Sequence, residues 1–215
     1  MFKIGGPMSL QISGEMLSML AITTMVGWLG SHALAAYQVL TQYFFLVIIP
    51  IFALSQAASI LIGHACGSEQ MGEIKTLGSS SLNVSLLISI IVGTVFILFP
   101  KILASLYFDV TKPENAEIVS LIIVLFAISA FTLLLDTVKN VITGALRGLF
   151  DSKFPMFVGL STIWLIGIPL SYLFAFTLHF GVIGIAMGSA VGMLIGAIII
   201  LYRWNVMSKQ AMSPA

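Results

Sequence analysis

Residues 117–144, EIVSLIIVLFAISAFTLLLDTVKNVITG, form the stretch that decides the fold. A helix needs about 20 mostly apolar residues to cross the hydrocarbon core of a bilayer, and this stretch exceeds that length. Its apolar residues are continuous, whereas the strands of a membrane barrel alternate over about 10 residues. The stretch therefore predicts a transmembrane α-helix that carries an acid, Asp136, and a base, Lys139, within the membrane.

Further apolar stretches of similar length lie on both sides of it, separated by polar segments at 64–77 and 100–116 and by short turns. The sequence thus predicts an all-α fold, a polytopic membrane protein in which a six-helix bundle occupies 8–203. An N-terminal segment, 1–7, and a tail, 204–215, are expected to lie in the cytoplasm. The expected spans are 8–30, 35–63, 78–99, 117–144, 154–178 and 182–203.

The composition agrees with a membrane protein. The chain is 59% hydrophobic and 8% charged, whereas an ordinary soluble domain carries roughly 25% charged residues. Nine Lys and Arg are too few for a basic patch, so no nucleic-acid partner is expected. No phosphate loop, dinucleotide fingerprint or Ser-His-Asp arrangement stands out, and we expect neither an enzyme nor a cofactor.

The distribution of positive charge predicts the orientation. An even number of spans places both termini on one side, and cytoplasmic segments carry an excess of Lys and Arg. With the termini inside, six basic residues face the cytoplasm and two face outward, which favours cytoplasmic termini. The inner set is Lys3, Lys75, Arg147, Lys153, Arg203 and Lys209, and the outer set is Lys101 and Lys112.

Prolines and glycines predict where the helices bend and pack. Pro50 and Pro169 each remove a backbone hydrogen bond, so each is expected to kink its helix, either as a fixed bend or as a hinge. In the last span, glycines recur every four residues, which places them on one face and allows a neighbouring helix to approach closely. These glycines are Gly184, Gly188, Gly192 and Gly196.

Ionisable residues inside the spans are the candidate functional residues. Glu15, Asp136 and Lys139 each cost on the order of 2.5–3.5 kcal/mol at a helix centre, so they are expected to face the protein interior or water. Polar residues at helical spacing accompany them on both helices. The residues expected to line a cavity are Gln11, Ser18, Thr132, Lys139, Asn140 and Thr143.

Two interpretations of these charges remain open. In the structural interpretation, Asp136 and Lys139 form an ion pair on one helix. No cation lies near Glu15 in the sequence, so a structural Glu15 would be a protonated carboxyl group packed between helices. Alternatively, the carboxyl groups form a cation site, because a low dielectric favours the neutral form of an acid and allows it to exchange a proton, a sodium ion or an organic cation. If sodium binds, Glu15 and Asp136 would be its ligands.

Short motifs occur in a fixed order along the chain. They are Gly6-Pro7 with Glu15, Ala33-Leu34-Ala35-Ala36-Tyr37-Gln38, Gln56-Ala57-Ala58-Ser59 with Gly63 and Gly67, Gly144-Ala145-Leu146-Arg147-Gly148, Trp164-Leu165-Ile166-Gly167-Ile168-Pro169-Leu170-Ser171-Tyr172, and Gly181-Val182-Ile183-Gly184. Over about residues 5–204, this set resembles the C-terminal lobe of the MATE (multidrug and toxic compound extrusion) family, in its NorM-like branch.

The resemblance implies a secondary transporter built from two six-helix lobes, which exports organic cations or drugs in exchange for sodium ions or protons. By motif position, the family's two cation-coupling acids fall on Glu15 and Asp136. The first lobe is absent, so we expect a missing N-terminal lobe or a partner chain. The alternatives are a non-transporting half-length remnant, an assembly subunit, or a lipid-linked flippase. A lysine beside the site, Lys139, is expected to hold Asp136 and to disfavour sodium.

Overall fold

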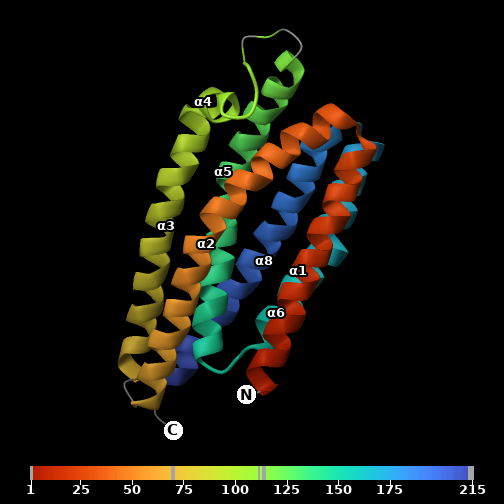
Figure 1. Cartoon of the computed structure of the whole chain (residues 1–215). Coiled ribbons are helices and arrows are strands. Elements are labelled where there is room, and N and C mark those ends of the chain that lie inside the picture. Colours follow the sequence, from red (N-terminus) through yellow and green to blue (C-terminus); the bar gives the residue numbers. More distant parts are fainter. Residues whose placement is uncertain (1, 69–70, 111, 113–114, 213–215) are drawn as a thin grey trace.

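Long helices run side by side in the computed structural model, which describes residues 2–68, 71–110, 112 and 115–212 (Figure 1). No strand occurs within these ranges, in agreement with the predicted all-α class. The elements are α1 (Phe2–Trp28), α2 (Ser31–Gly67), η1 (Met71–Glu73), α3 (Ile74–Leu98), α4 (Pro100–Ser105), α5 (Ala116–Gly148), α6 (Lys153–Ser161), η3 (Thr162–Gly167), α7 (Ile168–Tyr172), η4 (Leu173–Thr177) and α8 (Gly181–Met212).

The six predicted spans correspond to α1, α2, α3, α5, the segment Lys153–Thr177 and α8. Among the described residues, five of these segments are both long enough and apolar enough to cross a membrane, and α1 is the exception. With 27 residues α1 has the length to span, but polar residues such as Gln11 and Glu15 lower its hydropathy.

The helices extend further than the sequence predicted. α1 begins at Phe2 instead of residue 8, and α8 runs to Met212 instead of residue 203, so helix includes much of the predicted terminal segments. Each added residue of an existing helix gains a backbone hydrogen bond, which favours such extension. The start of α1 and the end of α8 lie at the same end of the bundle, as an even number of spans requires (Figure 1).

The two predicted loops are shorter than expected. α2 continues to Gly67 and α3 begins at Ile74, so helix covers much of 64–77. The loop at 100–116 contains α4, which begins with Pro100, a residue favoured in the first turn of a helix. Five residues of these loops, 69–70, 111 and 113–114, which include Glu69, Pro113 and Glu114, lie outside the described residues.

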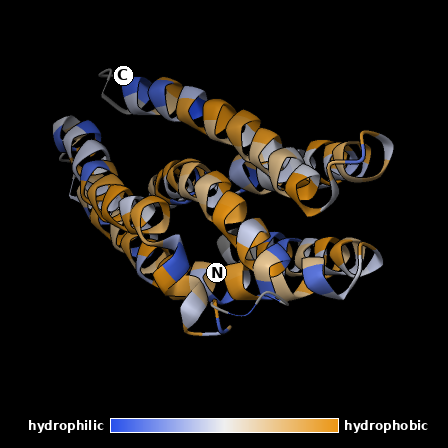
Figure 2. Cartoon of the chain, turned by 90° about the horizontal axis from the view of Figure 1, so that it is seen from above, coloured by the Kyte–Doolittle hydropathy of each residue, from blue (hydrophilic) through white to orange (hydrophobic). Residues whose placement is uncertain are grey.

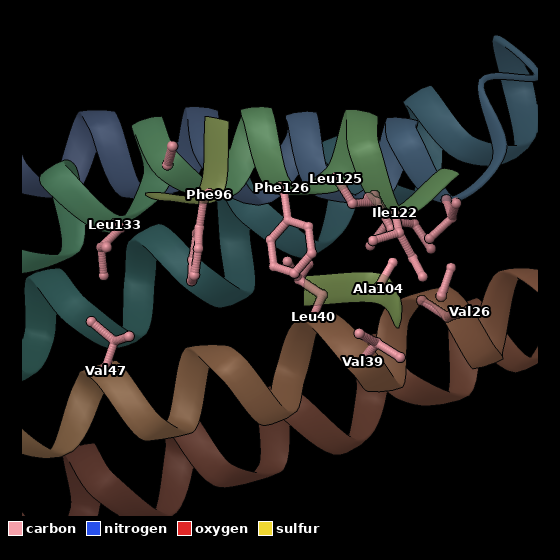
Figure 3. Packing of buried hydrophobic residues seen from close by; sticks show 14 of the residues in the cluster. Val26, Val39, Leu40, Val47, Phe96, Ala104, Ile122, Leu125, Phe126 and Leu133 are labelled. Atoms are coloured by element: carbon pink, nitrogen blue, oxygen red, sulfur yellow. The ribbon is translucent and has the colours of Figure 1, made fainter. Parts of the chain in front are cut away.

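The core forms around α5, which packs most extensively against α2, α3 and α8. Phe96 of α3 and Phe126 of α5 lie with their ring centroids 4.9 Å apart, and Leu40 and Val47 of α2 face them (Figure 3). Tyr43 packs edge-on against both rings and donates a hydrogen bond of 2.9 Å to the Leu103 carbonyl. This core fixes α5 between its three neighbours.

Glycines bring the backbones of α5 and α2 into contact. A methyl group at Gly144 would overlap the Ser55 backbone, and one at Gly148 would lie 2.7 Å from the Ser59 carbonyl oxygen. The Ser55 hydroxyl donates a 2.7 Å hydrogen bond to the Asn140 carbonyl across this contact. The two sequence motifs at 56–59 and 144–148 therefore meet at one close helix crossing.

The predicted disruptions at the two prolines occur in different forms. Figure 1 shows α2, drawn in orange, bent partway along its length, and Pro50 lies within this continuous helix. Around Pro169 the backbone instead adopts two π-helical segments, η3 and η4, with α7 between them. One of their wider turns is closed by a 3.0 Å hydrogen bond from the Leu178 amide to the Leu173 carbonyl.

The glycine stripe of α8 packs against this distorted span, as the spacing predicted. A methyl group at Gly184 would lie 2.6 Å from the Phe174 carbonyl carbon, and one at Gly192 would lie 2.9 Å from the Thr162 carbonyl oxygen. A methyl group at Gly188 would overlap the Ser171 backbone. The stripe therefore leaves room for the backbone of η3, α7 and η4.

The outer surface is apolar, as lipid contact requires. Leu46, Ile60 and Leu165 are each more than 70% exposed, at 72%, 72% and 74%. Figure 2 shows hydrophobic residues over much of the helices and hydrophilic residues near the C-terminal end of the chain. In water such a surface would be unusual for a monomer, whereas in a bilayer it contacts acyl chains.

Replacing Gly188 with Val tests the glycine contact. The added side chain would force α8 away from Ser171, and overpacking of this kind costs on the order of 1–3 kcal/mol. We expect a lower thermal unfolding midpoint for Gly188→Val in detergent. Gly27→Val is the matched control, because a methyl group at Gly27, also in a helix, meets nothing within 4 Å. Equal midpoints for the two variants would contradict the contact.

Candidate functional site

The polar side chains of α1 begin the candidate site. Gln11 lies one helical turn before Glu15, and its amide nitrogen donates a 3.1 Å hydrogen bond to Glu15 Oε1. Gln11 is buried, and the side chain of Glu15 is 31% exposed. Ser18 donates instead to the backbone carbonyl of Glu15 at 2.7 Å, so its hydroxyl bonds within its own helix.

Asp136 is buried in the middle of α5, with 2% of its surface exposed. Within the described part of the chain, its Oδ2 atom has no hydrogen-bond partner. The Asn140 amide, one turn further along α5, interacts with this carboxyl group. The buried hydroxyl of Thr143 also has no partner among the described residues, whereas Thr132 donates to the Ile128 carbonyl at 2.9 Å.

Lys139 joins the two helices. Its Nζ atom lies 3.4 Å from Glu15 Oε1, and its side chain is 5% exposed. Among the residues that the structure describes, no ion pair links Lys139 to Asp136, so the structural pair that the spacing suggested is not formed. The cation that pairs with Glu15 is far from it in the sequence, because Lys139 lies 124 residues away.

The sequence did not single out Arg147 as a candidate site residue, because the predicted span ends at residue 144 and Arg147 is counted among the residues that face the cytoplasm. The residue instead lies in the last turn of α5 and is buried, and its guanidinium donates a 2.9 Å hydrogen bond to Gln11 Oε1. A signal was present in the sequence. Asp136, Asn140, Thr143 and Arg147 follow one another at helical spacing, so Arg147 continues the polar stripe by one more turn.

Together these contacts form a polar network, defined here as Gln11, Glu15, Asp136, Lys139 and Arg147. In this network, α1 and α5 are connected by long side chains rather than by close packing of their backbones. The Glu15 carboxylate interacts electrostatically with both Lys139 and Arg147, and Asp136 interacts with Lys139. The formal charges of the two acids and the two bases cancel.

In the described ranges, no group of three His, Cys, Asp or Glu side chains is placed to hold a metal ion. Glu15 and Asp136 supply carboxylate oxygens, but the Lys139 ammonium lies 3.4 Å from Glu15 Oε1 and interacts electrostatically with Asp136. An ammonium at this position repels a metal ion.

Two open apolar grooves lie elsewhere on the surface. One, of about 390 Å³, lies between α1 and the α6–η3 segment, and the other, of about 450 Å³, lies beside α5, η4 and α8. The predicted cavity-lining residues line neither groove. Above the first groove, Trp164 Nε1 donates a 3.2 Å hydrogen bond to the Gly14 carbonyl and ties η3 to α1 next to Glu15.

Comparison with solved structures shows the same fold. The chain matches the MATE transporter VcmN of Vibrio cholerae in its bent form, with a TM-score of 0.85 at 18% identity, over 98% of this chain and 46% of that one. It matches a MOP superfamily transporter from Pyrococcus furiosus with a TM-score of 0.82 at 24% identity, over 99% of this chain and 47% of that one.

Two sequence relatives are named as multidrug resistance proteins. The "Multidrug resistance protein NorM" of Burkholderia vietnamiensis is 32% identical over 94% of this chain and 44% of its own length. The "Probable multidrug resistance protein NorM" of Synechocystis is 29% identical over 94% of this chain and 44% of its own length. The chain thus spans less than half the length of these curated relatives. The MatE family model matches residues 7–173, and the chain belongs to the MATE family.

Proposed function

We propose that this chain forms the C-terminal six-helix lobe of a cation-coupled multidrug efflux antiporter in a bacterial inner membrane, with both termini in the cytoplasm. It would act as a transporter and not as an enzyme. Its family and the multidrug-resistance names of its relatives support this proposal. The motif order, with Glu15 near the start and Asp136 eight residues before Gly144, supports assignment to the C-terminal lobe.

The observation that carries the proposal is the burial of Asp136 without a hydrogen-bond partner for Oδ2 in the described residues. A buried, partly unsatisfied carboxyl group in a membrane helix destabilises the fold. A purely structural role would be served better by a fully satisfied group. Such a carboxyl group fits a site that binds a cation during part of a cycle.

The proposed mechanism is competition for the two carboxyl groups. A coupling ion, either a proton or sodium, and an organic cation would neutralise the same negative charge in turn, so binding of one releases the other. Glu15 is partly exposed and Asp136 is buried, which suits entry at the first and retention at the second. Alternating access would come from rocking of this bundle against a second lobe.

Two other functions fit less well. A lipid-linked flippase would need a cationic site for anionic headgroups, and only Lys139 lies within the predicted spans. Arg147 adds a second buried cation, but Glu15 and Asp136 balance both charges. A non-transporting remnant or assembly subunit would have no use for a buried carboxyl group without a hydrogen-bond partner at Oδ2 in the described residues.

Removing either acid tests the coupling role. In cells that express the protein together with a six-helix N-terminal lobe, we expect Glu15→Gln and Asp136→Asn each to reduce drug resistance to the level of cells without it, because neither amide can exchange a cation. Efflux of a fluorescent organic cation and the amount of protein in the membrane would be measured together.

Glu117→Gln is the matched control. Glu117 also lies on α5, but its side chain is 68% exposed and pairs with His32 at 3.0 Å, outside the polar network. Its removal should leave efflux unchanged. Wild-type efflux in both Glu15→Gln and Asp136→Asn would refute the assignment.

Reconstitution separates a transporter lobe from a remnant. We expect proteoliposomes with this chain alone to show no drug uptake, because one lobe cannot enclose a central path. Uptake should appear when a six-helix N-terminal lobe is supplied with it. Absence of transport in the combined sample, with both parts folded, would favour the remnant or assembly subunit.

A further inference from the structure

The Lys139 ammonium occupies a central place in the polar network. It lies 3.4 Å from Glu15 Oε1 and interacts electrostatically with Asp136, three residues before it on α5. The side chain is 5% exposed, so bulk water screens these interactions little. The ammonium is therefore already the cation of this site.

Charge balance disfavours a bare metal ion between the two acids. In their ionised forms Glu15 and Asp136 contribute two negative charges, and Lys139 and Arg147 contribute two positive charges. A bound metal ion would add an uncompensated positive charge beside two buried cations. In a medium of low dielectric such an excess charge is strongly unfavourable.

We propose that Lys139 is a built-in counter-cation that excludes a monovalent metal ion from Glu15 and Asp136, so that the protein exports its substrate without using a sodium gradient. The proposal rests on the proposed function, because it takes these two acids as the coupling groups. It adds which ion they reject and which residue rejects it.

The neighbouring oxygen atoms show what removal of the ammonium would leave. Asp136 Oδ2 and the Thr143 hydroxyl are both buried and have no hydrogen-bond partner within the described residues. The carboxylate oxygens of Glu15 and Asp136 are the kind of ligand that hard cations bind. Without the charge of Lys139, the network would carry one net negative charge beside these oxygens.

Binding of radiolabelled sodium to the purified protein in detergent tests the proposal directly. We expect no saturable binding by the wild type. Lys139→Gln should bind sodium saturably, in competition with unlabelled sodium and not with choline. Addition of Asp136→Asn to that variant should weaken binding about tenfold to a hundredfold, because a charged ligand is lost.

Two control variants separate charge from side-chain size. Lys139→Arg keeps the positive charge and should stay unable to bind sodium. Lys153→Gln removes an exposed lysine at the start of α6 and should behave as the wild type. Thermal unfolding of each variant shows whether it is folded, and Lys139→Met serves as a second neutral variant.

Saturable sodium binding by the wild type that Glu15→Gln abolishes would overturn the proposal, whatever the Lys139 variants do. Absence of binding in folded Lys139→Gln and Lys139→Met would overturn it as well. These assays need no transport, so they remain informative if the proposed function fails. Conversely, sodium-driven export by the wild type would refute this inference, but it would agree with the proposed antiporter function.

Discussion

The close contact between the backbones of α2 and α5 is the constraint on which the rest of the structure depends. Gly144 and Gly148 have no side chains, so α5 lies directly against Ser55 and Ser59 of α2. This contact, with the aromatic core above it, holds α5 at the centre of the bundle. Because α5 is central, its polar stripe is withdrawn from lipid, and residues that would be expensive at the surface become tolerable.

A second glycine contact, between α8 and the span that contains Pro169, makes room for a distorted helix. The span that contains Pro169 loses a regular α-helical hydrogen bond, and its backbone widens into π-helical turns on both sides. The small residues of α8 accommodate this wider backbone and keep its polar groups covered. Through Trp164 and Gly14 the same span contacts α1 next to Glu15, so the distortion lies close to the polar network.

The polar network balances its own charges and also has features of a cation-binding site. Two acids and two bases from α1 and α5 cancel in charge, which makes their burial acceptable without a bound ion. One carboxyl oxygen nevertheless has no partner in the described residues, and one acid is partly exposed. That combination is suited to transient binding of a cation, and Lys139 controls which cation can enter.

The sequence by itself determined the features that arise from local patterns. Long apolar runs predicted the spans, four-residue spacing predicted the packed face of α8, and charged residues within spans identified Glu15, Asp136 and Lys139. Only the tertiary structure decided that Lys139 pairs with Glu15 and that Arg147 bonds to Gln11, because these partners are 124 and 136 residues apart. Periodicity along a helix shows which residues share a face, whereas the packing of helices determines what that face meets.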